Sequence, residues 1–164
     1  MFGDNKPEAT EQEWELLCQG LDRLGRIATD RGFKLCFHHH MATVVQTTAE
    51  TKRLMDHTNP RYVFLCYDTG HFTFSDEDPV EAARMFGDRI GHVHLKDIRR
   101  DKMKQAYDEG FKFRKAVLEG CFTIPGDGCV DYDGVFSELH KAGYEGWFIV
   151  EAEQDPAKAN PFEY

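Results

Sequence analysis

The chain has 164 residues, of which 41% are hydrophobic and 30% charged, and this composition suits one soluble domain with its own core. A formal net charge of −9 argues against a nucleic-acid backbone or an anionic membrane as the main partner. No apolar run reaches membrane-spanning length, and the acidic, proline-containing residues 1–10 are unlike a signal peptide.

The five cysteines are odd in number and include no Cys-x-x-Cys pair. Cys36 and Cys66 lie inside apolar segments, which favours buried, reduced thiols over a disulfide framework. We therefore expect a cytoplasmic protein.

The first third of the chain predicts two helices with a strand between them. Thr10 and Glu13 form a capping-box pattern ahead of apolar residues at helical spacing, so a helix is expected over 11–31. Residues 33–37 form a predicted strand that runs into three consecutive histidines. A second helix is expected over residues 48–57.

The later segments repeat this alternation of strand and helix. Residues 62–67 are an unbroken apolar run, which is typical of a parallel strand covered on both faces. Further elements are expected in this order: a helix from about Pro79, a strand over 89–95, a helix from about Asp131 and a strand over 146–150. The pattern predicts an α/β fold of parallel β/α units.

The alternation lapses between residues 96 and 128, where charged residues are frequent and the Ile-Pro-Gly-Asp-Gly segment 124–128 is rich in turn formers. A long loop directly after a strand is usually functional, so we expect a lid, a substrate wall or an interface. In the tail, Asp155-Pro156 is a pattern that starts helices, and we expect a helix start there that the chain does not complete.

Each predicted strand ends in side chains that bind metals. The four candidate ligands are His38, Asp68, His94 and Glu151, one after each strand, with His40 as the alternative to His38. Because the carboxyl ends of parallel strands meet at one edge of a sheet, these side chains should lie close together. Mixed carboxylate and imidazole ligands suit Mn²⁺, Co²⁺ or Zn²⁺.

Each residue taken alone also has a structural interpretation. An aspartate after a strand is often a turn or capping residue, and a single histidine in a strand is more often a hydrogen-bonded core residue than a ligand. Four successive strands that all end this way favour a metal site.

Other polar residues are candidates for substrate contacts or proton transfer. His71, Lys96 and Glu153 lie close in sequence to the predicted ligands, although a solvated rim would suit them equally well. Asp127 belongs to the turn-rich segment, where aspartate is common for conformational reasons alone.

Several strings in the sequence together resemble the inosose dehydratases of inositol catabolism, which belong to the xylose-isomerase-like TIM-barrel superfamily. These strings are HHHMATVVQT, DTGHFTF, GHVHLKD, IPGDG and GYEGWFIVEAEQDPAKANP. The resemblance extends from about Glu11 to the end of the chain. It implies a TIM-barrel fold and the loss of water from scyllo-inosose (2-keto-myo-inositol), with Mn²⁺ or Co²⁺ as the metal.

The resemblance also implies roles for individual residues. The superfamily's metal ligands on its last three strands fall on Asp68, His94 and Glu151. At the first ligand position, His38 stands where many relatives have glutamate, so the fourth ligand is His38, His40 or water.

The resemblance leaves the acid and base of the reaction to be chosen among His40, Lys96 and Glu153. His71 and Lys96 match positions near the substrate in relatives. Asp127, from the turn-rich segment, is the second candidate for a substrate contact beside His71.

A complete eight-stranded barrel takes roughly 250 residues, and this chain aligns with only the C-terminal half, about four strands. An open half-barrel would expose two sheet edges and an apolar interior. We therefore expect a homodimer or higher oligomer that closes the barrel. A truncated chain with a vestigial metal site is the alternative.

Three other functions compete with the dehydratase interpretation. A ketose isomerase or epimerase of the same superfamily would favour paired glutamate ligands, and His38 argues against it. The superfamily's DNA endonuclease branch would need a basic groove, which the net charge of −9 disfavours. A metal- or sugar-binding remnant without turnover is the non-enzymatic interpretation.

Overall fold

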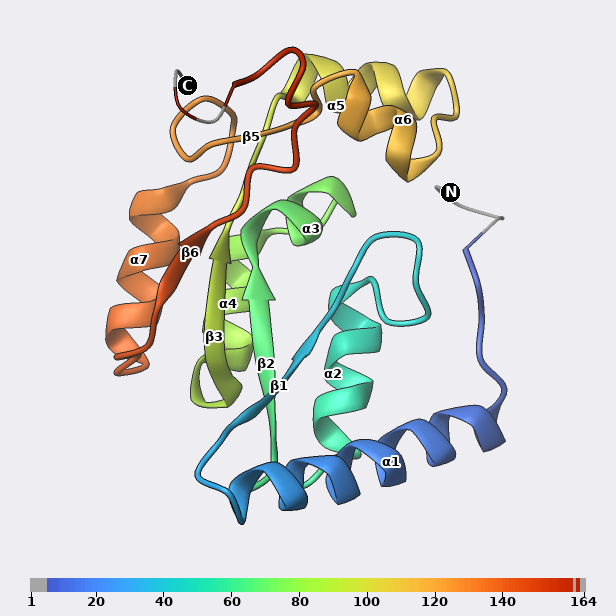
Figure 1. The fold of residues 1–164 in the computed structure, drawn as a ribbon, viewed down its shortest axis with the longest axis vertical. Coiled ribbons are helices and arrows are strands. Elements are labelled where there is room, and N and C mark those ends of the chain that lie inside the picture. The colour runs from blue at the N-terminus through green and yellow to red at the C-terminus, as the bar shows by residue number, and fades with distance from the viewer. Residues whose placement is uncertain (1–5, 161, 163–164) are drawn as a thin grey trace.

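The computed structural model describes residues 6–160 and 162, and what the sequence predicts for residues 1–5, 161 and 163–164 lies outside this description. A four-stranded parallel sheet in the order β1-β2-β3-β6 organises the molecule (Figure 1). Its strands are β1 (Leu35–His38), β2 (Val63–Asp68), β3 (Ile90–Leu95) and β6 (Phe148–Val150). The predicted α/β fold of parallel units is confirmed, and it forms about half a barrel.

The predicted helices begin close to the expected residues. They are α1 (Glu11–Thr29), α2 (Thr48–Asp56), α4 (Pro79–Phe86), which continues into a 3₁₀ turn η2 (Gly87–Arg89), and α7 (Tyr132–Lys141). Thr10 and Glu13 form the expected capping box of α1, and Thr47 and Glu50 form a second one at α2. Asp78 caps α4 by accepting hydrogen bonds from two backbone N–H groups.

A short helix that the sequence did not predict, α3 (Thr69–Phe74), starts directly after β2. Asp68 is its N-cap, and the carboxylate oxygen Oδ1 accepts a hydrogen bond from the His71 N–H at 2.9 Å. The helix is nearly all buried, and its apolar side chains hide the helical period from the sequence pattern.

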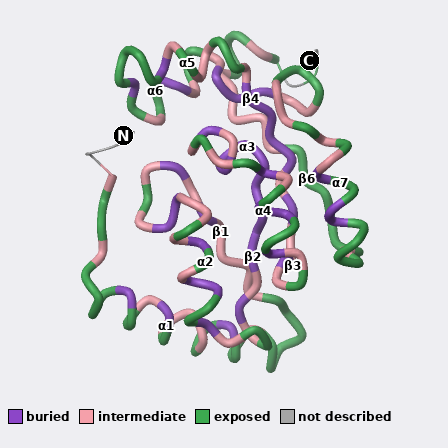
Figure 2. The backbone as a smooth tube through the Cα atoms, turned by 180° about the vertical axis from the view of Figure 1, so that it is seen from behind, coloured by how far each residue is buried: buried purple, intermediate pink, exposed green. Residues whose placement is uncertain are grey.

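The core lies along the two central strands. Val63, Leu65, Tyr67 and Val93 are completely buried there. In contrast, every residue of β1 is only partly buried and every residue of β6 is exposed. Figure 2 shows buried residues along β2 and exposed ones along β6. The two edges of the sheet therefore carry much less cover than its centre.

The segment 96–128 is not the open loop that the sequence predicts. It contains a two-stranded antiparallel sheet, β4 (Asp97–Ile98) with β5 (Phe122–Thr123), and the helices α5 (Arg100–Asp108) and α6 (Phe113–Leu118). In Figure 1 this unit lies beyond the carboxyl ends of the strands.

A second apolar cluster holds this unit together. Its buried members from this segment are Ile98, Ala106, Phe111, Ala116, Cys121 and Phe122. They are widely spaced among charged residues, so no regular pattern reveals the short helices in the sequence. The apolar contacts make the unit a packed cover over the strand ends.

Two smaller expectations have clear outcomes. In the tail, the N–H of Ala159 donates to the carbonyl of Asp155 at 2.9 Å, so one helical turn starts at Asp155 and does not continue into a helix. The five cysteines are all free thiols, and three of them are buried. Among the described residues, the helices are all too short or too polar to cross a membrane.

Candidate metal centre

The structure brings the four predicted ligands together at the carboxyl edge of the sheet. His38, Asp68, His94 and Glu151 each offer one ligand atom, and these four atoms lie within 4.8 Å of one another. Asp68 Oδ2 is 3.3 Å from His38 Nε2 and 3.5 Å from His94 Nδ1. Glu151 Oε2 is 3.1 Å from the same His94 nitrogen. The predicted convergence is therefore present.

The sheet register sets the height of these side chains. Asp68 on β2 lies opposite His94 on β3. Leu95 pairs with Val150, and the N–H of Glu151 donates to the carbonyl of Leu95 at 3.1 Å. A strand shifted by one residue would turn its ligand to the other face of the sheet. The hydrogen-bond ladder thus sets Asp68 directly beside His94, with Glu151 one residue beyond the Leu95–Val150 pair.

Asp68 combines the structural and the functional interpretations of an aspartate after a strand. Its Oδ1 caps α3, while its Oδ2 faces the histidines. The side chain is completely buried. The cap fixes the carboxylate orientation, so one oxygen is held ready for a ligand role.

Strong electrostatic coupling links the group. Hydrogen bonds to Asp68, Cys66 and Glu151 raise the pKa of His94 to about 12. The hydrogen bond from His94 is the main cause that lowers the pKa of Glu151 to about 2. Burial opposes this shift, and Lys96 adds to it. Burial alone would raise the pKa of Asp68, but its contact with His71, the hydrogen bonds from His38 and His94, and the ammonium of Lys96 lower that pKa well below its usual value.

The donor set fits a divalent transition metal. Two imidazole nitrogens and two carboxylate oxygens suit Mn²⁺, Co²⁺ and Zn²⁺, and they converge without a structural rearrangement of the strands. In the metal-free protein the raised pKa of His94 favours a proton on Nδ1, which faces Asp68 Oδ2 and Glu151 Oε2. Because a metal ligand must be deprotonated, an ion would take the place of that proton.

Lys96 lies inside the cluster and not on a solvated rim. Its side chain is completely buried. The ammonium nitrogen Nζ is 2.6 Å from Glu153 Oε2, 2.8 Å from Glu151 Oε2 and 3.1 Å from His71 Nε2. Although burial opposes the charged form, Asp68 and Glu153 outweigh it and raise the pKa of Lys96.

His40 and His71 form a second group with Glu153. One ligand atom from each of these three residues lies within 4.8 Å of the others. The His40 Nδ1 lies 2.8 Å from the carbonyl oxygen of Met41. Since a carbonyl can only accept, Nδ1 carries the proton and Nε2 carries the lone pair. Burial lowers the pKa of His71 well below its usual value, so its ring is neutral.

Asp127 does not join the ligand group. Its Oδ2 is 2.6 Å from an Arg99 guanidinium nitrogen and accepts a hydrogen bond from Thr123 Oγ1 at 2.7 Å. These contacts hold the turn-rich segment against β5. Its predicted role as a substrate contact stays a prediction.

Sequence reasoning missed two buried polar residues that support the site. Asp97 accepts hydrogen bonds from the N–H groups of Gly126 and Val130, which anchors the turn-rich segment beside the site. His39 is completely buried and stacks on Phe72 with ring centroids 3.7 Å apart. The position of Asp97, directly after Lys96 at a strand end, was the available signal. For His39 the neighbouring histidines masked any signal.

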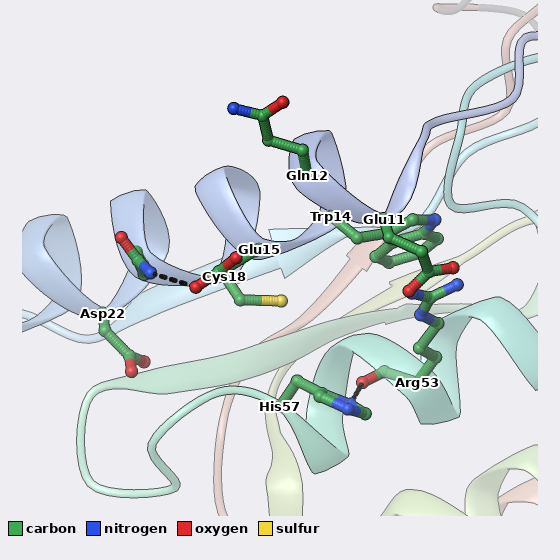
Figure 3. Close-up of a pocket in the computed structure, with 9 residues that line it drawn as sticks. Glu11, Gln12, Trp14, Glu15, Cys18, Asp22, Arg53 and His57 are labelled. Carbon is green, nitrogen blue, oxygen red and sulfur yellow. Dashed lines mark hydrogen bonds and ion pairs between the residues drawn. The ribbon is translucent and has the colours of Figure 1, made fainter.

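Two pockets bear on the location of a ligand. One, of about 460 Å³, opens beside Glu153, and its lining residues are Ile124, Val150, Ala152, Glu153, Gln154, Pro156 and Ala159. The other, of about 440 Å³, lies between α1 and α2 (Figure 3). There the Arg53 guanidinium lies 4.5 Å from the Trp14 ring centroid and pairs with Glu11. The first pocket adjoins the ligand group, whereas the second contains none of its members.

Comparison with known proteins agrees with the fold. The chain is 53% identical over 161 residues to an inosose dehydratase of Geobacillus thermodenitrificans, covering 98% of this chain and 54% of that protein. It is 54% identical over 159 residues to an inosose dehydratase of Bacillus velezensis, covering 97% of this chain and 53% of that protein. The chain thus spans about half the length of the curated relatives it matches.

Solved structures share the fold at lower identity. The IolI protein with a bound zinc atom matches with a TM-score of 0.70 and 21% identity, covering 91% of this chain and 51% of that one. An L-ribulose 3-epimerase matches with a TM-score of 0.66 and 19% identity, covering 89% and 43% of the two chains. A family model described as xylose isomerase-like TIM barrel matches residues 1–163. The chain belongs to the xylose isomerase-like TIM barrel family.

Proposed function

We propose that this chain provides the metal-binding half of an inosose dehydratase that removes water from scyllo-inosose. The observation that carries the proposal is the convergence of four ligand atoms from four strand ends within 4.8 Å. Identity of 53–54% with proteins named inosose dehydratase supports this choice of substrate over other sugars.

In this proposal His38, Asp68, His94 and Glu151 hold one divalent ion. Mn²⁺ or Co²⁺ is the expected metal, and Zn²⁺ also suits the donor set. When bound, the ion would act as a Lewis acid toward the ketone oxygen of the substrate. The chain's own contribution is a set of ligands already aligned by the sheet register.

His40 and Lys96 are the proposed base and acid. The lone pair on His40 Nε2 takes the proton from the carbon next to the ketone, and the carbon–hydrogen electrons form a carbon–carbon double bond. The bond to the β-hydroxyl breaks, and the Lys96 ammonium donates a proton to it, so water leaves. Glu153, 2.6 Å from Lys96 Nζ, stabilises the ammonium before that transfer.

His71 and Asp127 are the proposed substrate contacts. The neutral imidazole of His71 exchanges hydrogen bonds with a substrate hydroxyl near Lys96. Asp127 would bind a hydroxyl farther out, from the segment that covers the site.

We also propose that a second copy of the chain covers the open sheet edges. Trp147, Phe148, Ile149 and Val150 are 41–74% exposed along one such edge. Unpaired strand edges with apolar residues favour association. The chain should sediment as a dimer or larger species in a reducing buffer, which keeps its five thiols free. A stable, well-folded monomer would contradict this part of the proposal.

The direct test is turnover of scyllo-inosose by the purified chain supplied with Mn²⁺. Mass spectrometry should detect a product lighter by one water, and Asp68→Asn should abolish it. An epimerase or isomerase would give a product of unchanged mass. Metal binding without any change in the substrate would favour the non-catalytic alternative.

A further inference from the structure

Four acceptor atoms surround the ammonium of Lys96. In addition to Glu153 Oε2, Glu151 Oε2 and His71 Nε2, the oxygen Asp68 Oδ2 lies 3.4 Å from Nζ. The Lys96 side chain has no solvent exposure. A buried ammonium surrounded in this way resembles a coordinated cation more than a flexible surface lysine.

Two of these acceptors belong to the proposed metal set, and the other two belong to the second ligand group. Asp68 Oδ2 and Glu151 Oε2 also face the ligand histidines. Glu153 and His71, together with His40, form the second group. The ammonium therefore stands between two sets of ligand atoms that share a border. Two-metal sites place their ions roughly 3.5–4 Å apart, bridged by carboxylates in this manner.

Backbone contacts hold Lys96 in this position. Thr69 Oγ1 accepts a hydrogen bond from the Lys96 N–H at 2.9 Å and donates one to the Lys96 carbonyl at 2.8 Å. Gly70 leaves room for the side chain, because a Cβ there would lie 2.6 Å from Lys96 Cγ. The Phe122 ring covers Nζ from a centroid distance of 5.6 Å. The location of the ammonium is thus built into the fold.

We infer that the Lys96 ammonium is a fixed second cation that restricts the site to one divalent ion. This inference rests on the metal set of the proposed function. The ammonium neutralises part of the charge of Asp68, Glu151 and Glu153. It also occupies the space between the proposed metal ligands and the second ligand group. A second divalent ion at His40, His71 and Glu153 would have to displace it. Without the ammonium, those three residues form a site for a second ion.

The test compares metal content in wild type and Lys96→Met, which keeps the length of the side chain and removes its charge. Each purified chain is titrated with Mn²⁺, and bound metal per chain is measured by mass spectrometry. We expect the variant to bind one ion more than wild type, with the spin-coupled electron paramagnetic resonance signal of two ions about 4 Å apart. Lys104→Met, on the exposed face of α5, is the matched control and should match wild type.

A double variant locates the additional ion. Adding His71→Phe to Lys96→Met should return the metal content to the wild-type value, because the second group then loses a ligand. If Lys96→Met does not fold by circular dichroism, Lys96→Gln carries the same expectation. Failure of both to fold would overturn the inference in favour of a purely structural counter-charge.

The remaining outcomes separate this inference from the proposed function. A folded Lys96 variant that binds no more Mn²⁺ than wild type overturns the inference, as does a wild-type chain that binds two ions. A wild-type chain that binds none contradicts the proposed function, and the difference between variant and wild type still decides whether Lys96 excludes an ion.

Discussion

The central and the edge strands of the sheet hold their ligands in different ways. Asp68, on central β2, is completely buried, whereas the Glu151 side chain, after edge strand β6, is 40% exposed. The strand residues near these two ligands differ in the same way. Val93 on β3 is 0% exposed, whereas Val150 on β6 is 56% exposed. The centre of the site is therefore organised by this chain's own core, while its edge depends on whatever covers β6.

This difference implies a division between stability and metal binding. A buried carboxylate surrounded by cations is costly to remove even without metal, because its partners then lack a counter-charge. A partly exposed carboxylate can be removed with less effect on the metal-free protein, since water replaces part of its contacts. Both should matter equally to an ion that needs both ligands.

The largest expected effect separates these two carboxylates. Asp68→Ala should lower the free energy of unfolding of the metal-free chain by about 3–5 kcal/mol, because buried Lys96 loses a partner and α3 loses its cap. Glu151→Ala should lower it by less than about 1 kcal/mol. Urea unfolding measures both, and calorimetry should show that both variants lose Mn²⁺ binding. Equal losses of stability would contradict the comparison.

The same truncation in two places tests the sheet itself. Val93→Ala should lower the free energy of unfolding by about 2 kcal/mol, since it opens a cavity under β3. Val150→Ala should change it by no more than about 0.5 kcal/mol in the monomer. Urea unfolding at low and high protein concentration checks this. A large loss at Val150 only at high concentration would show that another copy covers this edge.

Two glycine substitutions test how tightly the centre is packed. Gly70→Ala should lower the free energy of unfolding by about 1–3 kcal/mol, because its Cβ would lie 2.6 Å from the Lys96 side chain. Gly20→Ala on α1 is the matched control. Nothing lies within 4 Å of its new Cβ, so it should stabilise the helix by up to about 1 kcal/mol. Thermal unfolding distinguishes them, and equal shifts would contradict the packing.

A further expected effect is a pH dependence from His39. Burial, only partly offset by the charge of Asp68, lowers the pKa of His39 to about 3, against about 6.5 in an unfolded chain. Below pH 6.5, His39 therefore binds a proton in the unfolded state but stays unprotonated in the folded state. The folded state should lose up to about 1.4 kcal/mol per pH unit as the pH falls from about 6.5 towards 3.

His39→Gln removes this titrating group and provides the comparison. Between pH 6.5 and 5, urea unfolding of the metal-free variant should depend less steeply on pH than that of wild type. His140→Gln, on the exposed surface of α7, should retain the wild-type slope. A variant as steep as wild type would show that His39 is accessible to protons in the folded protein.

The sequence predicted most of the fold because the relevant signals are local. Caps such as Thr10 and Asp78 act within one helical turn, and the apolar run before Asp68 marks a buried strand within six residues. The helices of segment 96–128 were missed because their burial comes from distant partners such as Phe74, not from their own periodicity.

The sequence by itself determined that four parallel strands end in His38, Asp68, His94 and Glu151, because strand type and side-chain alternation are encoded along each segment. Only the tertiary structure decided how these groups meet. Lys96 contacts Glu153 across 57 residues of sequence, and that contact depends on the register of β3 against β6. Register and burial are properties of the assembled sheet, so they alone decided between a solvated rim and a buried contact for Lys96.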